Sequence, residues 1–372
     1  MNTKKQYRVG GIDIPYLIIS ILIIAIGFLT MISAYSGKSF EGMDYREAVF
    51  KFALRQIGYL GFGVACAVAA CRLFHWSFYQ KIAVPFYGVM LVLMVLTAIF
   101  GKEIYGAKRW FLGIQPSEIV KISLIFVMAK YIAEWPKKQR MTFLGSLQML
   151  IFVVPMAIIA VLGQRHLSVT IIFLMITALM LLVSGVNRWL IVAGGGAGVL
   201  GVICIILFGA GFRGDRIQGW LHPFSAANKT GASWQVVQSL YAIASGGLFG
   251  RGYTQSREKY AWLPMADNDY IFSVFAEEFG YVACVLMIIL FGVFIWRGIV
   301  IASRAPNVFL TMVAFGITMM FAVQILLNIC IVCNVLPSTG IQLPFFSSGG
   351  TSLIVSVASV GLVLNVSKYR TK

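Results

Sequence analysis

The sequence predicts an all-α polytopic membrane protein, a bundle of ten transmembrane helices with a large extracytoplasmic loop between the seventh and the eighth. Of its 372 residues, 59% are hydrophobic and 12% are charged, a composition that no soluble domain of this length would tolerate on its surface. Apolar runs long enough to cross about 30 Å of hydrocarbon, at about 1.5 Å per residue, recur along the chain. The ten predicted spans lie, in order, near residues 14–35, 53–71, 82–100, 117–133, 145–162, 167–184, 189–209, 270–296, 308–333 and 348–367.

The first apolar run follows Lys4, Lys5 and Arg8, as the apolar core of a signal peptide does. It is too long for a cleaved segment, so we expect a retained first span and no cleaved targeting segment. We also expect a single domain over residues 1–372, because no stretch has the composition of a separate soluble domain. The long loop, about 210–268, is an exception in a chain with short loops, and loops of this length are usually functional.

Lysine and arginine indicate the orientation of the bundle. With the N-terminus inside, the inner and outer segments carry equal numbers of these residues. The charges of the long loop have little topological weight, and leaving them out favours both termini in the cytoplasm. The net charge of +17 exceeds what orientation needs, so the outer cations either bind a ligand or attract anionic lipid headgroups. We expect no nucleic-acid partner, because the cations are dispersed between the spans.

All six cysteines fall within apolar runs, where they resemble small buried hydrophobic residues. Cys330 and Cys333 have the CxxC spacing, but no second pair and no neighbouring histidine completes a zinc site. We therefore expect no metal site built by these side chains.

The fourth predicted span carries charges at its start, where a charge in a membrane costs several kcal/mol unless it is paired or hydrated. Pro116 suits the first turn of a helix, and Ser117 can satisfy free backbone N–H groups there. Glu118 benefits from the positive helix N-terminus and is spaced to pair with Lys121 on one face. This pair either belongs to a functional site or is an internal ion pair that neutralises itself.

Two basic groups lie on segments expected outside. Lys108, Arg109 and Trp110 form a basic, aromatic lip that either binds a ligand or anchors the chain at the interface. Arg213 and Arg216 lie about one turn apart at the start of the long loop. Two guanidiniums at that spacing could bind a diphosphate, although a snorkelling pair at a helix end is the simpler explanation.

The stretch Met265–Tyr281 places four carboxylates ahead of an apolar run, on Asp267, Asp269, Glu277 and Glu278. If a helix begins near Asp269, Glu277 lies about 80° round from it and Glu278 roughly opposite, so the two glutamates cannot both face what Asp269 faces. Capping is the expected role for one of the two aspartates. The other could be a general base with a raised pKa or a proton relay in a transporter.

The segment Asn334–Ile354 is rich in Pro, Gly, Ser and Thr, including Ser347 and Ser348, yet it lies between two apolar runs. Irregular backbone near a membrane survives where it lines a cavity or is buried in protein. We therefore expect this hairpin to form part of a pocket wall. The alternative is an outer turn before the last span, with Pro344 near its first turn.

Four sequence blocks resemble the signature blocks of the SEDS family, which comprises FtsW, RodA and SpoVE. They are GAKRW…IQPSEIVK, QSLYAIASGGLFGRG, LPMADNDYIFSVFAEEFG and LPSTGIQLPFFSSGGTSL, and their order and separations match as well. The resemblance implies ten transmembrane helices in the plasma (inner) membrane of a bacterium, with both termini cytoplasmic. It also implies an enzyme that polymerises lipid II into β-1,4 glycan strands of peptidoglycan at the outer face.

The resemblance further implies roles for single residues. The carboxylate that the family requires falls on Asp269, the expected general base when the 4-hydroxyl of GlcNAc attacks lipid-linked MurNAc with inversion. Cations, or a divalent metal ion such as Mg²⁺, would stabilise the departing diphosphate, and no other cofactor is expected. Glu118 with Lys121, and Glu277, would hold the pocket and tune Asp269. The residues expected at the substrate are Lys108, Arg109, Glu118, Lys121, Arg213, Arg216, Lys259, Glu277, Ser347 and Ser348.

Three local features refine the resemblance. The block Gln255–Lys259 is closer to FtsW and SpoVE than to RodA, which favours a role in cell division. In Gly163–Thr170, Arg165 and His166 replace the proline and acid of many relatives, so no catalytic acid is expected there. His166 is either a polar substitute or, more commonly for a lone histidine, a structural residue. Asn268 replaces a common threonine.

A cognate class B penicillin-binding transpeptidase is the expected partner, because this chain has no soluble domain able to crosslink peptides; other division or elongation machinery would accompany it. Three alternatives remain: an elongation-type polymerase, a lipid II flippase, and a scaffold. A flippase would depend on intramembrane groups such as Glu118 and Lys121, and a scaffold would not need Asp269. The acid and bases cluster at the outer lip of the bundle, which favours the enzyme.

Overall fold

The computed structural model describes residues 7–38, 44–104, 107–136, 138, 141–186, 189, 219–225, 233–260 and 262–371. Helices form nearly all of its regular structure. They are α1 (Ile14–Ser36), α2 (Tyr45–Arg72), α3 (Trp76–Phe100), α4 (Pro116–Glu134), α6 (Phe143–Gln148), α7 (Val153–Ile158), α8 (Leu167–Ser184), α11 (Trp234–Ser245), α12 (Ile271–Ser303), α13 (Val308–Val332) and α14 (Gly350–Ser367). The short strands are β1 (Tyr7–Val9), β2 (Lys102–Ile104), β3 (Ala107–Trp110) and β4 (Tyr369–Thr371).

Eight helical segments of the described chain are long and apolar enough to cross a membrane. They match eight of the predicted spans. In one of them, Phe143–Gly163, a 3₁₀ turn joins α6 to α7 and a π turn follows α7. The predicted span 117–133 is α4, which carries several charged side chains and is not among the eight, but it packs between α3 and α13. The predicted span 189–209 lies outside the described residues except Trp189. The all-α multi-pass fold class is confirmed.

Two helices begin ahead of the predicted apolar runs. The side chain of Asp44 accepts from the N–H of Arg46 and begins α2 eight residues before the predicted position 53. His75 likewise accepts from the N–H of Ser77 and begins α3 before the predicted position 82. Capping thus extends these helices beyond their apolar runs, which hydropathy alone does not reveal.

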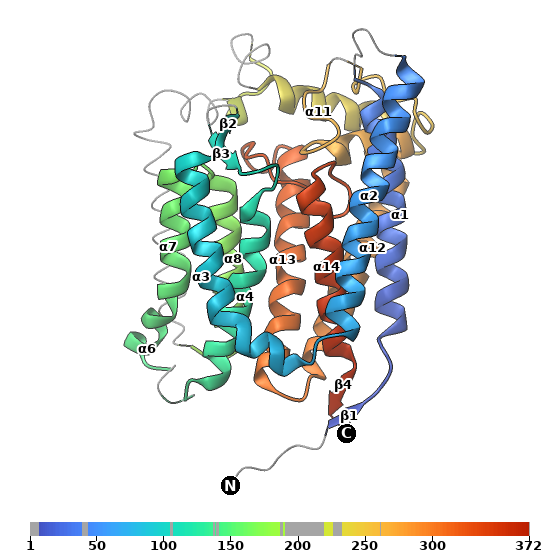
Figure 1. Cartoon of the computed structure of the whole chain (residues 1–372). Coiled ribbons are helices and arrows are strands. Elements are labelled where there is room, and N and C mark those ends of the chain that lie inside the picture. Colours follow the sequence, from blue (N-terminus) through green and yellow to red (C-terminus); the bar gives the residue numbers. More distant parts are fainter. Residues whose placement is uncertain are drawn as a thin grey trace.

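The helices form a bundle whose two ends differ (Figure 1). Within it, α14 packs along α2, while α13 contacts α4, α8 and α12. The β2–β3 hairpin and α11 lie at one end, and β1 and β4 lie at the other. There β1 pairs antiparallel with β4, with Arg8 opposite Arg370, so the two ends of the described chain lie together. An Arg297–Asp13 ion pair at 2.8 Å ties α12 to the start of α1 nearby.

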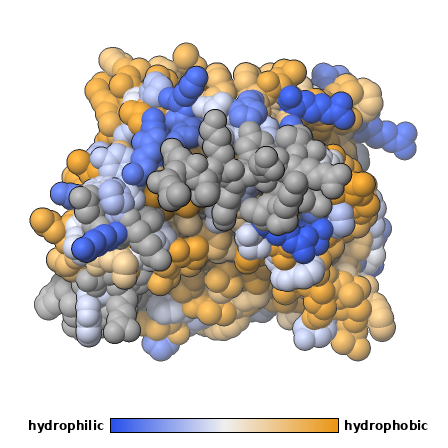
Figure 2. Space-filling view, turned by 90° about the horizontal axis from the view of Figure 1, so that it is seen from below, coloured by the Kyte–Doolittle hydropathy of each residue, from blue (hydrophilic) through white to orange (hydrophobic). Residues whose placement is uncertain are grey.

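The end of the bundle that carries β1 and β4 is shown in Figure 2, where hydrophobic side chains occupy much of the periphery and hydrophilic side chains lie in patches between them. Large apolar side chains are exposed on the helices, for example Ile18 of α1 and Leu286 of α12, which are 52% and 61% exposed. An apolar flank with polar patches at the end is the distribution expected of a bundle that spans a membrane.

A break in α12 at Gly280 separates a short first part, Ile271–Phe279, from the long remainder. Gly280 has φ +80° and ψ −179°, which L side chains rarely adopt. The freed N–H groups of Tyr281 and Val282 donate to the carbonyls of Gly247 and Leu248, at 2.9 and 3.1 Å. A turn of the long loop therefore supplies hydrogen-bond acceptors for the backbone N–H groups that the break leaves free, as backbone near a membrane requires.

Candidate active site

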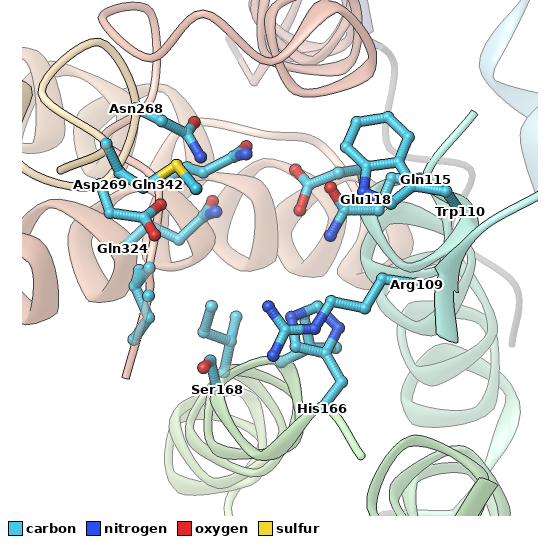
Figure 3. A pocket seen from close by; sticks show the side chains of 15 residues that line it. Arg109, Trp110, Gln115, Glu118, His166, Ser168, Asn268, Asp269, Gln324 and Gln342 are labelled. Carbon is cyan, nitrogen blue, oxygen red and sulfur yellow. The ribbon is translucent and has the colours of Figure 1, made fainter. Parts of the chain in front are cut away.

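A cavity of about 270 Å³ opens among the helices at the end that carries β2, β3 and α11. Segments far apart in the sequence meet here (Figure 3). It is lined by Arg109 and Trp110 of β3, Gln115 and Glu118 at the start of α4, His166, Ser168, Val169 and Ile172 around the start of α8, Met265, Asn268 and Asp269 before α12, Gln324 of α13, and Gly340, Ile341 and Gln342. Gln324 lies about 12 Å along α13 from its end at Val332, so the cavity reaches into the bundle.

Asp269 is held by backbone contacts on the wall of this cavity. The side-chain amide of Asn328 donates to the carbonyls of Asp269 and Ile341, at 2.8 and 2.7 Å. Gly340, at φ +68°, lies so close that a Cβ added there would be 3.1 Å from Oδ2 of Asp269. The predicted irregular hairpin therefore forms part of the cavity wall and supports the segment that carries Asp269.

Burial raises the pKa of the Asp269 carboxyl from its ordinary 3.8 to about 6. The positive charge of Arg109 opposes this rise, and the negative charge of Asp267 adds to it. Figure 3 shows Arg109 across the cavity from Asp269. A carboxyl with this pKa is ionised at neutral pH and is still basic enough to take a proton.

Glu118 and Lys121 form the predicted ion pair, with 2.8 Å between Nζ and Oε2 and both side chains buried. Pro116 occupies the first turn of α4, as predicted. The capping role predicted for Ser117 is wrong, because its buried Oγ makes no hydrogen bond with any described residue. Glu118 lines the cavity, and Lys121, one turn further along α4, neutralises the charge of Glu118.

Neighbouring residues of β3 take different positions. Arg109 lines the cavity. The ammonium of Lys108 donates to the carbonyl of Ile99 at 3.2 Å and does not line it. Successive side chains on a strand point to opposite faces, which separates this basic pair. The other predicted pair, Arg213 and Arg216, lies outside the described residues.

Asp267 does not cap α12, which corrects the expectation from the sequence. Helix α12 begins after Tyr270, and no side chain caps it. The carboxylate of Asp267 instead accepts from Lys38 and from the hydroxyl of Ser348, both at 2.9 Å. The aspartate therefore ties the end of α1 and the 333–349 segment to the segment that carries Asp269.

A second cavity of about 400 Å³ lies beside the first. Lys38, Arg55, Asp267 and Ser348 contribute its charged and polar groups, together with the first residues of α14. Both cavities are lined by Trp110, Met265, Asn268 and Gln342. Two polar cavities thus meet at the segment Met265–Asp269.

Ser347, next to Ser348, has a structural position. Its hydroxyl donates to the carbonyl of Asn268 at 2.7 Å and accepts from the N–H of Leu343 at 2.9 Å. It lines neither cavity, but it fixes the backbone immediately before Asp269.

Glu277 lies away from both cavities, fully buried on the first part of α12. Its carboxylate accepts from the hydroxyl of Ser256 at 2.5 Å and from the N–H groups of Arg257 and Glu258 at 2.9 and 3.3 Å. The guanidinium of Arg251 is 3.6 Å away. Glu277 therefore binds the long loop to α12.

Lys259 and Glu278 form a second buried ion pair, at 2.8 Å, and both side chains are 0% exposed. Glu278 also accepts from the hydroxyl of Ser33 on α1 at 2.6 Å. Lys259 lines neither cavity. No role for Glu278 could be predicted from the sequence. In the structure, Glu278 joins α12 to α1 and to the long loop.

Several cavity residues were not among those predicted from the sequence. Lys38 and Arg55 contribute charge to the second cavity, and Gln324 and Gln342 contribute amides to the first. The sequence could have indicated Gln324, because an amide side chain within an apolar run needs a hydrogen-bond partner or a cavity. It did not indicate Lys38 and Arg55, since they resemble ordinary interfacial cations.

A divalent cation would find few ligands among the described residues. No group of three or more His, Cys, Asp and Glu there is placed to hold a metal ion. Asp269 could give one carboxylate to an ion that arrives with a diphosphate, whereas Glu118 is already paired with Lys121.

The sequence and the fold have counterparts among known proteins. Residues 15–372 match the family FTSW_RODA_SPOVE, described as cell cycle protein. The stage V sporulation protein E of Bacillus subtilis (strain 168) is 34% identical over 376 residues, covering 99% of each chain. The probable peptidoglycan glycosyltransferase FtsW of Trichlorobacter lovleyi is 31% identical over 373 residues, covering 98% of this chain and 95% of that protein.

A solved structure of a peptidoglycan synthase complex, described as coordinating polymerization and crosslinking, contains a chain of the same fold. It has a TM-score of 0.79 at 24% identity and covers 96% of this chain and 97% of that one. The family match spans nearly the whole chain, and the fold agrees with it. The chain therefore belongs to the SEDS family of FtsW, RodA and SpoVE.

Proposed function

We propose that this chain is a peptidoglycan glycosyltransferase that polymerises lipid II into β-1,4 glycan strands, with Asp269 as the general base. The observation that carries the proposal is the position of Asp269 in a polar cavity within a membrane bundle, with a pKa raised to about 6 by burial. Relatives such as the FtsW of Trichlorobacter lovleyi are described as probable peptidoglycan glycosyltransferases, which supports the same reaction.

In this reaction, Asp269 takes the proton of the GlcNAc 4-hydroxyl as its oxygen attacks the anomeric carbon of MurNAc. The new C1–O4 bond forms as the bond from C1 to the phosphate oxygen breaks, with inversion, and the diphosphate leaves with the bonding electrons. Arg109 faces the same cavity and would stabilise that developing charge. Arg213 and Arg216 remain proposed diphosphate ligands from the long loop.

The two cavities suit a reaction between two lipid-linked substrates. They meet at Met265 and Asn268, next to Asp269, so one saccharide in each would bring the reacting groups to the carboxylate. In the second cavity, Lys38 and Arg55 would offset the charge of a diphosphate.

A plasma-membrane location with both termini in the cytoplasm belongs to the same proposal. β1 and β4 lie at the end of the bundle opposite the two cavities, so this orientation opens the cavities at the outer face. Green fluorescent protein fused after Lys372 would then fluoresce, whereas export of that end would leave the fusion dark.

The proposed partner is a class B penicillin-binding transpeptidase, and the proposed role is division-type synthesis. The partner is supported by the similar chain in a complex described as coordinating polymerization and crosslinking. Both a sporulation protein and FtsW proteins are close relatives, so rescue of a division-arrested depletion strain, compared with rescue of spore formation, separates the two roles.

The decisive experiment is lipid II polymerisation by the purified protein with its partner. Asp269→Asn should abolish polymer while leaving the protein folded. Asp267→Asn is the matched control: it changes a buried carboxylate two residues away, and we expect reduced but measurable polymer. Equal polymer from wild type and Asp269→Asn would overturn the mechanism.

A lipid II flippase is the second candidate, because the buried Glu118–Lys121 pair lies on α4, inside the helical bundle. It predicts that lipid II crosses vesicle membranes without polymer, and that Glu118→Gln stops the crossing while Asp269→Asn does not. Polymer formation that depends on Asp269 would favour the enzyme.

A further inference from the structure

His166 lies in the first cavity, yet the proposed proton transfer gives it no role. Its side chain is 3% exposed, and its buried Nδ1 makes no hydrogen bond with any described residue. It occupies the N-cap position of α8 without capping it. A buried polar group with no partner is uncommon in folded proteins and calls for a ligand, a water or a functional reason.

The backbone around His166 holds the imidazole at the cavity. The N–H of His166 donates to the carbonyl of Ala160 at 2.8 Å. Arg165 before it has φ +52°, a strained turn for a non-glycine residue, and the side chain of Gln164 donates to the carbonyl of Met94 at 3.0 Å. These contacts hold the backbone that carries the imidazole at the cavity.

The imidazole is neutral at physiological pH. Burial, with the positive charges of Arg109 and Lys121, lowers the pKa of His166 to about 3. The other ionisable groups that line the cavity are Glu118 and Asp269. A neutral imidazole carries one hydrogen-bond donor and one acceptor, whereas a guanidinium carries donors only.

These properties match an uncharged, hydroxyl-bearing ligand. A sugar hydroxyl or acetamido group can both donate and accept, and so can satisfy a neutral imidazole. A phosphate would favour a charged imidazole, which burial and the neighbouring cations oppose. Arg109, on the same side of the cavity in Figure 3, is suited to that charged group.

We infer that His166 binds the saccharide of the lipid-linked substrate by hydrogen bonds, while Arg109 binds its diphosphate. The inference rests on the proposed glycosyltransferase function. It makes His166 a specificity-determining residue for the N-acetylhexosamine, separate from proton transfer.

Binding in detergent tests this division with two probes, lipid II and undecaprenyl diphosphate, which lacks the saccharide. Each variant is made in the Asp269→Asn background, so that no turnover occurs. His166→Leu should weaken lipid II binding about tenfold, the effect of one lost buried hydrogen bond, and leave undecaprenyl diphosphate binding unchanged. His166→Gln, which keeps a donor and an acceptor, should recover most of the affinity. Arg109→Gln should weaken both probes.

Retained binding of undecaprenyl diphosphate shows that His166→Leu is folded. Equal weakening of both probes, or of neither, would overturn the inference, and so would a failure of His166→Gln to recover affinity. His75→Gln, which changes the N-cap residue of α3 beside β4 at the opposite end of the bundle, is the control and should bind both probes as the parent does. Because binding needs no chemistry, the inference can fail while polymerisation stands, and the reverse.

Discussion

The side-chain amide of Asn328 donates to the backbone carbonyl of Asp269 at 2.8 Å and is itself 0% exposed. The same amide donates to the carbonyl of Ile341 at 2.7 Å. One side chain of α13 thus fixes two walls of the first cavity relative to each other. The position of the proposed base depends on this contact, because no side chain caps the helix that follows it.

Asn328→Ala should therefore lower kcat for lipid II polymerisation at least tenfold. It leaves the buried carbonyl of Ile341 and the partly buried carbonyl of Asp269 without their donor, and an unpaired buried group costs about 1–3 kcal/mol. Asn365→Ala is the matched control, because Asn365 also donates to backbone carbonyls, those of Ala70, Cys71 and Phe74, but away from the cavities. Both variants should lower the unfolding temperature, and only Asn328→Ala should lower kcat of the folded fraction.

Gly340→Ala should reduce polymerisation more than its small size suggests. Its φ of +68° disfavours any side chain, and the new Cβ would lie 3.1 Å from Oδ2 of Asp269. The loop or the carboxylate must then move, so we expect kcat to fall while lipid II binding persists. Gly292→Ala, in α12 with nothing within 4 Å of the added Cβ, is the control and should keep full activity. Equal activity of the two variants would show that Gly340 does not constrain the base.

The pH profile should report Asp269. Its raised pKa of about 6 means that protonation removes the base below that pH, so kcat/KM should fall about tenfold per pH unit on the acid side. Arg109 lowers this pKa, so Arg109→Gln should move the acid limb to higher pH. Lys108→Gln is the control, because Lys108 bonds to the carbonyl of Ile99 outside the cavity and should leave the limb in place. An unchanged limb in Arg109→Gln would contradict the role of that charge.

Much of this architecture could be predicted from the sequence, because membrane spans require long apolar runs and no other segment satisfies that requirement. The i, i+3 spacing also predicted the Glu118–Lys121 pair, which is local to one helix. Asp267 shows where such reasoning fails. The capping preference depends on neighbouring residues only. Asp267 instead accepts hydrogen bonds from Lys38 and Ser348, which tertiary packing brings from far along the chain.

The cavity itself could not be predicted from patterns of spacing. Arg109 and Asp269 are 160 residues apart and share a cavity through the packing of α4, α8, α12 and α13. Periodicity gives the face of a residue on its own helix, not the element that it meets. Only the resemblance to the family marked Asp269, and only the packing shows that Gln324 and His166 lie in the same cavity.

Lys259 offers the last prediction, because the sequence placed it at the substrate and the structure pairs it with Glu278. Lys259→Met leaves a carboxylate buried and unpaired, which should lower the free energy of unfolding by about 3 kcal/mol or more. Replacing both residues, Lys259→Met with Glu278→Met, should restore most of that stability, since it removes the unpaired charge. Lys51→Met, which breaks an exposed pair with Glu47, should change stability by less than about 1 kcal/mol.

Kinetics of the same variants decide between a structural and a binding role for Lys259. Neither Lys259 nor Glu278 lines either of the two cavities, so the double variant, once folded, should keep the KM of the parent for lipid II. A double variant that regains stability but binds lipid II more weakly would show that Lys259 contributes to substrate binding. The double variant separates these outcomes because it removes both charges of the buried pair. No unpaired charge then remains buried to destabilise the protein.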